Sequence, residues 1–559
     1  MSKSKAFQRV RPARLKRNMF NLSYPIQATI AAGKLIPIFS QETIPGDIFR
    51  ISSGVEIRTQ PLVAPLFGNL NVEMRYFYVP NRLVWPNFTE FLMGKENDDK
   101  GIHIHPYIPV EVGSETGPGT LADFFGVPTN IEDRINALPF RAYNLIYNEF
   151  FRDQNLQDAV PVRLADGEDS MSNYEMKNVC WSKDYFTSAL PWTQAGSDVD
   201  MHHLVKLVDQ KWDPESNPPL SFAKSQIIVD ANYGPDDVIP YVSGGNRYLG
   251  MPSGSVGFGT QSYADRSDGN IVYSNGGGAN ITQQSLGGFG LIDPNDTWEV
   301  EMSLLELRKA SALQRFLERS AMVGSSRYAD WLRGMYGVSV GDYSLQRPQY
   351  LGGGKCTINV SSVEQTSSTD DVSPQGSLAG KGYVVNGFKT NRPFLCAEHG
   401  WIIGMMYVRP TAYYSMGLDR SMIKENRFDY FLPGFEHIGE QEILKKELFA
   451  LSGDNQYKDT NNDTFGYQER YAQLKWHRGM ICGEFKDSLS AWVMPRQLQN
   501  MDPSVDSPIA LNGKFVECDP NLDNNFAVSA SNADQFLVNC YHFSKALRTI
   551  SYFPNYKLI

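Results

Sequence analysis

Three segments in the first 80 residues carry strand patterns, and one of them alternates apolar and polar positions with the period of two that is typical of β-strands. In the segment NVEMRYFYV at 71–79, every second position from Val72 to Tyr78 is apolar or aromatic, which predicts a strand with one face more deeply buried than the other. Pro80 ends this segment. KLIPIF at 34–39 and IFRISSGVEIRT at 48–59 predict two further strands.

The middle of the chain changes to helical spacing. PFRAYNLIYNEFFR at 139–152 places aromatic and aliphatic residues on one helical face after a proline suited to a first turn. Ser303 and Glu306 form an S-x-x-E capping box ahead of regularly spaced leucines, which predicts a helix over 303–323. A second, shorter helix is predicted from 327 to 336.

Strand patterns return in the last third of the chain. The segments that carry them lie at 399–410, 480–485, 515–518 and 535–543. The chain is therefore β-rich at both ends and helical in the middle. This order favours a mainly β protein, an antiparallel sandwich completed by distant segments with long excursions between strands, over alternating βαβ units.

Residues 244–290 form a glycine-rich segment, with 13 glycines in 47 positions. A structureless insertion of this length is uncommon in a compact domain unless it has a role or is a linker. Its aromatic residues, which a glycine-serine tether lacks, favour a long surface excursion. The apolar anchors are Tyr248, Phe258, Tyr263, Ile271, Val272, Tyr273 and Phe289. Of these, Tyr248, Phe258, Tyr263 and Tyr273 are the candidate contact residues of the segment.

Length and composition predict a folded protein with a large core. The chain has 559 residues, 42% hydrophobic and 20% charged, far from a disordered profile. No stretch approaches the roughly 18 uninterrupted apolar residues of a membrane span, and no apolar signal core follows the basic start, so we expect a cytosolic product. The six cysteines never form a C-x-x-C pair, which argues against a zinc knuckle or redox motif.

Charge is distributed unevenly along the chain. Residues 1–17 carry seven cations and no acid, whereas the remaining residues 18–559 carry a net charge of −17. A basic arm joined to an acidic body suggests that nucleic acid is contacted by the arm and not by a basic binding face. An ordinary solvated terminus explains the same charges equally well. The seven residues are Lys3, Lys5, Arg9, Arg11, Arg14, Lys16 and Arg17.

No set of residues indicates an enzyme. The run from Gly352 to Lys355 lacks the first glycine and the final Ser or Thr of a phosphate-binding loop, so we interpret it as a glycine-rich turn. His103 with His105, and His202 with His203, have no Cys or carboxylate at a familiar metal-ligand spacing. No serine forms G-x-S-x-G. We therefore expect no catalytic residue, no metal site and no cofactor.

Several segments together resemble one protein family. GKLIPIFSQETIPGDIFRI at 33–51, YFYVPNRLVWPNFTEFLMG at 76–94 and FLERSAMVGSSRYADWLRGMYGV at 316–338 are similar to the major capsid proteins of microviruses, particularly the gokushovirus branch. LQRPQYLGGGK at 345–355 and PQGSLAGKGYV at 374–384 extend the resemblance in the same order. These segments cover about a third of the chain and are dispersed along it.

The resemblance implies an eight-stranded antiparallel jelly roll, the viral β-sandwich, with long loop and helical insertions. Eight strands of about five or six residues would account for fewer than about 50 residues. It also implies a single capsid domain over 18–559 that assembles, one copy per asymmetric unit, into a T=1 icosahedral shell around circular single-stranded DNA. The implied location is the virion, assembled in the cytoplasm of the host bacterium.

The implied partners are further copies of the chain in pentamers and shell, the packaged DNA, a small basic DNA-packaging protein, a minor pilot protein and a host surface receptor. The segment 244–290 would form an outer protrusion that contacts the receptor. The competing interpretation is a β-sandwich phage spike or carbohydrate-binding protein. Such a protein would purify as a monomer or small oligomer instead of a shell.

Overall fold

A computed structural model describes residues 16–94, 96–97, 101–111, 116–194, 204–207, 248–250, 262–267, 270–275, 280–281, 298–301, 304–322, 327–366, 375–436, 439–451, 458–496, 498, 509–528 and 533–552. The chain divides into two compact units. Unit 1 contains residues Met1–Ser197 and Arg315–Ile559, and unit 2 contains Asp198–Gln314. Unit 2 therefore interrupts unit 1 in sequence.

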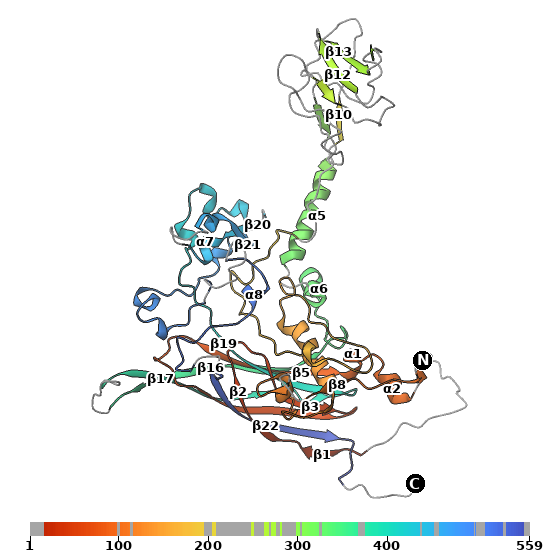
Figure 1. The fold of residues 1–559 in the computed structure, drawn as a ribbon, viewed down its shortest axis with the longest axis vertical. Helices are drawn as coiled ribbons and strands as arrows, with labels where there is room; N and C mark the ends of the chain where they lie inside the picture. The colour runs from red at the N-terminus through yellow and green to blue at the C-terminus, as the bar shows by residue number, and fades with distance from the viewer. Residues whose placement is uncertain are drawn as a thin grey trace. The chain divides into compact units, whose positions relative to one another are not determined.

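Unit 1 is built on one ten-stranded antiparallel sheet (Figure 1). Its main path is β1-β22-β4-β17-β16-β5-β19-β3, with β2 paired to β22 and β18 paired to β4. The strands are β1 (Asn18–Asn21), β2 (Tyr24–Ile30), β3 (Ile36–Thr43), β4 (Ile48–Thr59), β5 (Leu70–Pro80), β16 (Gln349–Glu364), β17 (Leu378–Lys389), β18 (Phe394–Leu395), β19 (Gly400–Pro410) and β22 (Phe536–Arg548).

The connectivity of the eight longer strands is that of a jelly roll. Along the path, β2, β22, β4 and β17 form one half, and β16, β5, β19 and β3 form the other. The first long strand thus pairs with the last, and the second, β3, pairs with the seventh, β19. Interleaved pairing of this kind is the double Greek key of the jelly roll. The predicted fold class is confirmed, although these strands have 7 to 16 residues and are longer than expected.

The two halves of the sheet curl toward each other and enclose the main core. β16 makes the bend, because Gln349–Ile358 pairs with β5 whereas Asn359–Glu364 pairs with β17. Hydrogen bonds cross the core: Ser53 in β4 lies 2.6 Å from the Tyr76 hydroxyl in β5, and His542 Nε2 lies 2.9 Å from the carbonyl oxygen of Ile38. Burial raises the pKa of Tyr76 and lowers that of His542 to about 4.

The other face of the β5–β19 half is covered by the insertion that follows β5. Its elements include α1 (Asn81–Val84), α2 (Phe88–Met93), α3 (Leu121–Phe124), α4 (Leu138–Ile146) with a π-turn at Tyr147–Phe151, and the short strands β6 (Glu96–Asn97), β7 (Gly101–Ile102), β8 (Tyr107–Val110) and β9 (Asp133–Asn136). Phe140 and Tyr143 of α4 pack with Phe77 and Met405 in a second core. β5 is therefore buried on both faces, so its alternating apolar and polar residues do not indicate an exposed face.

The helices predicted in the middle of the chain are confirmed. α4 with its π-turn covers the predicted 139–152, and α5 (Leu304–Met322) and α6 (Tyr328–Tyr336) match the next two. All lie between β5 and β16, outside the sheet. α6 ends at Gly337, whose φ of 69° is the left-handed conformation that favours glycine. Ser303 of the expected capping box lies outside the described residues.

Two strands predicted near the C-terminus are wrong. Residues 480–485 contain one isolated bridge and then a 3-10 turn at Gly483–Lys486, where Gly483 has a φ of 70° that a strand does not allow. Residues 515–518 include the end of α8 (Gly513–Val516), which begins because the Asn512 side chain accepts a hydrogen bond from the Phe515 amide. Phe515, Val516 and Cys518 of the second insertion are apolar because they are buried, whereas only Ile481 is buried in 480–485 and Met480 is 61% exposed.

The expected glycine-rich turn at Gly352–Lys355 is also wrong, since these residues lie inside β16. Gly353 pairs with Arg75 of β5, and a Cβ at Gly353 would lie 2.0 Å from the carbonyl oxygen of Met74. A bulge shifts the register between Tyr350 and Gly352. The glycines therefore permit close backbone approach between β16 and β5 next to this bulge.

The second insertion lies between β19 and β22. It contains β20 (Glu440–Leu444), α7 (Lys445–Leu448), β21 (Thr464–Glu469) and α8, together with several 3-10 turns. Its apolar residues form a third core together with Tyr185, Phe186 and Ala189 of the first insertion. In unit 2, β10 (Leu204–Leu207) pairs with β15 (Trp298–Glu301). A separate antiparallel sheet there has the order β11 (Tyr248–Gly250), β12 (Ser262–Ser267), β13 (Asn270–Asn275), β14 (Asn280–Ile281).

Candidate nucleic-acid and assembly surfaces

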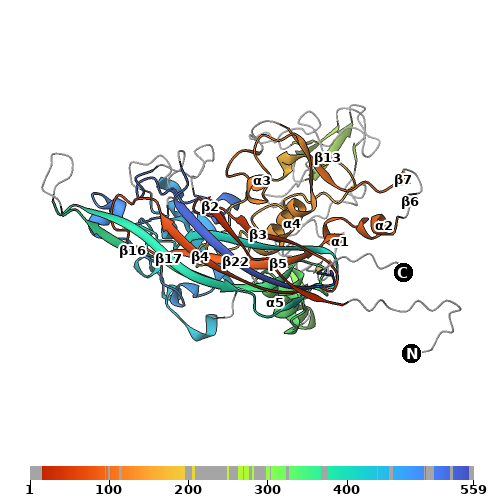
Figure 2. The same ribbon diagram turned by 90° about the horizontal axis from the view of Figure 1, so that it is seen from below.

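Among the described residues, most of one face of the jelly roll is covered by neither insertion core, and only its end at Glu56, Arg58, Leu537 and Asn539 borders the first insertion, near residues 118–126. Along β22, buried residues alternate strictly with exposed ones from Phe536 to Ala546, and β4 and β17 show the same alternation. Figure 2 shows these strands side by side. The residues between the buried ones point away from the core of the jelly roll, and we call this set the outer sheet face. It consists of Leu537, Asn539, Tyr541, Phe543 and Lys545 of β22, Arg50, Ser52, Gly54, Glu56 and Arg58 of β4, and Lys381, Tyr383, Val385, Gly387 and Lys389 of β17.

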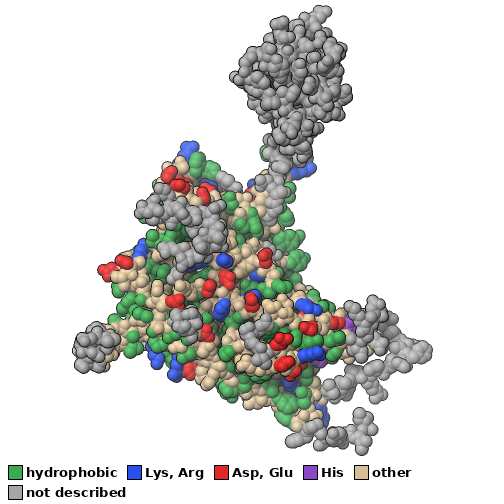
Figure 3. Space-filling model, viewed as in Figure 1, with side chains coloured by type: hydrophobic (Ala, Val, Ile, Leu, Met, Phe, Trp, Pro, Cys, Tyr) green, Lys and Arg blue, Asp and Glu red, His purple; other side chains and the backbone are tan. Residues whose placement is uncertain are grey.

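The outer sheet face is basic, unlike the body as a whole. It carries five cations and a single acid, Glu56. Arg58 binds that acid at 2.6 Å and holds the pKa of Glu56 below its ordinary value. On the side of unit 1 seen in Figure 3, by contrast, acidic and basic side chains are mixed. The positive face was missed because the net charge of the body sums over all surfaces, and because β17 was not recognised as a strand.

The described part of the basic arm adjoins this face. Lys16 and Arg17 are exposed and come directly before β1, whose Asn21 pairs with Lys545 at the edge of the sheet. Arg17 also lies close enough to Asp47 to lower the pKa of that carboxyl, against the stronger effect of burial, which raises it. The other five predicted arm residues, Lys3, Lys5, Arg9, Arg11 and Arg14, lie outside the described residues.

Three of the four residues predicted for the protrusion lie in strands of unit 2. Tyr248 begins β11, Tyr263 is in β12 opposite Gly250, and Tyr273 is in β13 opposite Ala264. Phe258 lies outside the described residues. The backbone pairing thus brings the three tyrosines into one small antiparallel sheet.

Large apolar side chains are exposed on both insertions of unit 1. Met93 and Met422 are each 77% exposed, and further examples are Ile104, Tyr430 and Leu474. Single exposed apolar residues are ordinary, but several in one region mark surfaces that bind other proteins. The sequence contains these residues without any pattern that separates them from core residues.

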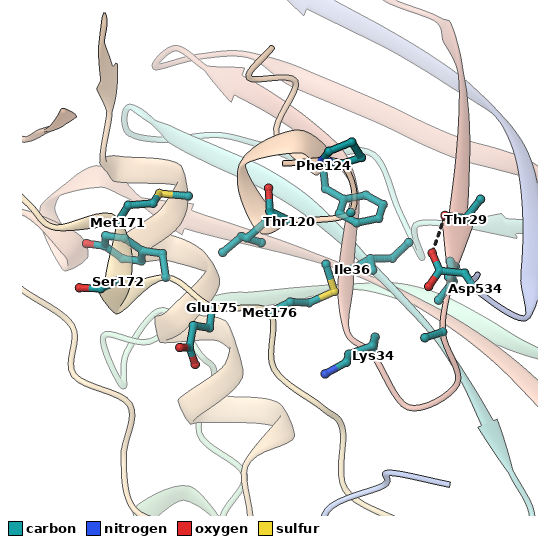
Figure 4. A pocket seen from close by; sticks show the side chains of 16 residues that line it. Thr29, Lys34, Ile36, Thr120, Phe124, Met171, Ser172, Glu175, Met176 and Asp534 are labelled. Carbon is teal, nitrogen blue, oxygen red and sulfur yellow. Dashed lines mark hydrogen bonds between the residues drawn. The ribbon is translucent and has the colours of Figure 1, made fainter. Parts of the chain in front are cut away.

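A pocket of about 550 Å³ lies between the jelly roll and the first insertion (Figure 4). Ile36 of β3, Phe124 of α3 and Met176 give it apolar walls, and the Thr29 hydroxyl donates a hydrogen bond to Asp534 at 2.5 Å. Its charged lining consists of Lys34, Glu175 and Asp534. These charges of both signs are not the lining expected for a phosphate site.

The histidines considered as metal ligands have other partners. His103 lies 2.6 Å from Asp166 and 3.2 Å from Glu90, and the hydrogen bond to Asp166 raises its pKa. His105 packs against the rings of Trp85 and Phe91, and burial lowers its pKa. His202 and His203 lie outside the described residues. Within the described ranges, no group of three His, Cys, Asp or Glu side chains is placed to hold a metal ion, and no helix is long and apolar enough to span a membrane.

Comparison with known proteins connects this architecture to phage capsids. The family profile described as "Capsid protein (F protein)" matches residues 8–555. "Capsid protein VP1" of Chlamydia phage 1 is 31% identical, covering 93% of this chain and 92% of the relative. The same-named proteins of Bdellovibrio phage phiMH2K and Spiroplasma virus 4 are 32% and 28% identical, covering 94% and 85% of this chain and 92% and 83% of the relatives. The chain belongs to the capsid protein (F protein) family and is a major structural subunit of a phage shell.

Proposed function

We propose that this subunit assembles, one copy per icosahedral asymmetric unit, into a T=1 shell that encloses circular single-stranded DNA. The observation that carries the DNA contact is the charge asymmetry, with seven cations and no acid in the segment ahead of β1 and a net charge of −17 on the rest. The basic segment, Lys3 to Arg17, faces the interior and binds DNA without sequence preference. Subunit contacts use the exposed apolar residues of the insertions more than the strands, and the subunit has no catalytic step.

Neutralising the arm tests its part in DNA binding. If all seven cations meet phosphates, the slope of log affinity against log salt should be about −5, from about 0.7 per contact on a single strand. Changing the seven cations to Gln should flatten the slope and release DNA at lower salt. DNA retention by purified shells across a salt series measures both effects.

A scrambled arm of the same length and composition is the matched control and should retain DNA as the native arm does. Unchanged retention and slope in the Gln variant would show that the arm is a solvated terminus or serves assembly. A small basic DNA-packaging protein, as the resemblance implies, would take over part of the neutralisation. Retention should therefore be measured with and without such a protein in the particle.

We further propose that residues 244–290 lie on the outer surface of the shell as a protrusion that contacts a host receptor. The support is that this range falls within unit 2, which has its own antiparallel sheet. Deleting 244–290 should leave the yield of shells, counted by electron microscopy, largely intact and reduce attachment to host cells. Loss of soluble subunit on deletion would instead make the segment part of the folding core.

The remaining partners follow from the family and complete the proposal. A minor pilot protein and the packaging protein join the subunit in the virion, and assembly takes place in the host cytoplasm. Pentamers of the subunit form before the closed shell.

A further inference from the structure

Two glycines face each other in the middle of the outer sheet face. Gly54 of β4 pairs with Gly387 of β17, and Tyr541 of β22 pairs with Gly54 on its other side. A Cβ at Gly387 would meet no atom within 4 Å, and a Cβ at Gly54 would meet only the Phe543 ring, at 3.8 Å. Neither glycine has a positive φ. The fold thus does not require glycine at either position.

Glycine inside a strand weakens the strand and often marks a place where a ligand approaches the backbone. Two adjacent glycines leave a gap in the layer of side chains that otherwise covers this face. We call this gap the glycine hollow. Because neither backbone conformation nor crowding explains the pair, the hollow indicates a binding surface.

Two exposed aromatic rings border the hollow. Tyr541 is 43% exposed and Phe543 is 52% exposed, and their ring centroids lie 4.6 Å apart. Both extend from β22 on the side of Gly54 opposite Gly387. Exposed aromatic rings beside an open floor are the arrangement on which nucleic-acid bases stack, and stacking is available to every base because each has a π-face.

Three cations lie near the hollow on the same face of the sheet. Lys389 is two residues from Gly387 along β17, and Arg50 and Lys545 are four residues from Gly54 and Tyr541. Lys389 pairs with Ser52, which pairs with Phe543, and the next outward pair along is Arg50 with Lys545. Same-face neighbours along a strand are about 7 Å apart. None of the three makes an ion pair with another described residue. They are therefore available to phosphates on either side of a stacked base.

We infer that the glycine hollow with Tyr541 and Phe543 is a base-stacking site for single-stranded DNA, with Arg50, Lys389 and Lys545 holding the flanking phosphates. The inference rests on the proposed function, because it assigns to the packaged DNA a second contact besides the arm. The basic segment continues from the same sheet edge, since Asn21 of β1 pairs with Lys545. Charge favours DNA over a second copy of this face, because its unpaired charges are all positive.

Base stacking is tested with two probes that share phosphates and differ in bases. Full-length unassembled subunit is titrated with fluorescent oligo-dT and with an abasic strand of the same length. Stacking of one base at the hollow should make oligo-dT bind at least about fivefold more tightly. Gly387→Thr fills the hollow with a residue favoured in strands, and should abolish the preference without lowering the thermal midpoint.

The double variant Tyr541→Ser/Phe543→Ser should lose the same preference, whereas Tyr343→Ser, at an exposed tyrosine outside this face, should keep it. Lys389→Gln with Lys545→Gln should weaken both probes equally and reduce the salt slope by about 1.4. Equal binding of the two probes by the unaltered subunit, or an unchanged preference in the filled variant, would overturn the inference. So would variants that stop shell assembly while leaving the preference intact, since the face would then be a subunit interface. A failed arm test would not change these results, so the two proposals fail separately.

Discussion

Replacing Arg141 with Met should lower the free energy of unfolding of unit 1 by about 3 kcal/mol or more. The Arg141 side chain is fully buried in α4, and its guanidinium donates to both oxygens of buried Asp169, at 2.7 and 3.0 Å. It also donates to the carbonyl oxygens of Val84 and Ala165. Removing one partner of a buried ion pair leaves a charge without compensation, which costs about 3–5 kcal/mol. Arg163 lies 3.2 Å from Asp169 and partly compensates the charge of Asp169. The expected loss of stability is therefore near the lower end of this range.

Denaturant titration followed by tryptophan fluorescence measures this loss, because buried Trp85 lies beside Val84 in the same core. The double variant Arg141→Met/Asp169→Leu should recover part of the stability, since the unpaired charge is gone. Arg58→Ala removes a solvent-exposed ion pair and should leave the denaturation midpoint nearly unchanged. Equal stability of the Arg141 and Arg58 variants would contradict the role assigned to the buried pair.

Gly353→Ala should destabilise the jelly roll and reduce the yield of shells. The added methyl group would lie 2.0 Å from the Met74 carbonyl oxygen and 2.9 Å from the Cα of Arg75, so β16 would have to move away from β5. Overpacking of this kind costs about 1–3 kcal/mol, and more where backbone must shift. Denaturant titration and particle counts by electron microscopy measure the two effects.

Gly387→Ala is the matched control, because the new methyl group there meets no atom within 4 Å. It should be neutral or slightly stabilising. If both alanine variants unfold at the same denaturant concentration, the close approach of β16 to β5 does not decide the stability of the sheet.

Patterns that depend on a single element were predictable from the sequence. The strand expected at 48–59 is β4, and the one expected at 399–410 is β19 almost to the residue, because both combine β-favouring residues with clear flanking turns. α5 and α6 have uninterrupted helical spacing, and α6 is followed by a stop glycine. The resemblance to microvirus capsid proteins implied the eight-stranded antiparallel jelly roll, whereas the order of the strands in the sheet comes from the structure.

Features that depend on pairing between distant segments were not predictable. β16 and β17 contain glycines at Gly352–Gly354, Gly380, Gly382 and Gly387, so local propensity argues against strands there. Several of these glycines are explained only by a neighbouring strand, as at Gly353. The outer sheet face was missed for the same reason, because Arg50, Lys389 and Lys545 come together only when β4, β17 and β22 pair.

Cryo-electron microscopy of the purified full-length chain, assembled with single-stranded DNA, shows whether the subunit closes into a shell around DNA. We expect closed icosahedral particles with one jelly roll per asymmetric unit and with residues 244–290 on the outer surface. We also expect the outer sheet face to line the lumen, with density for DNA against the hollow at Gly54 and Gly387. Monomers or small oligomers without closed shells, or shells in which this face contacts a neighbouring subunit and residues 244–290 lie inside, would contradict the proposed assembly.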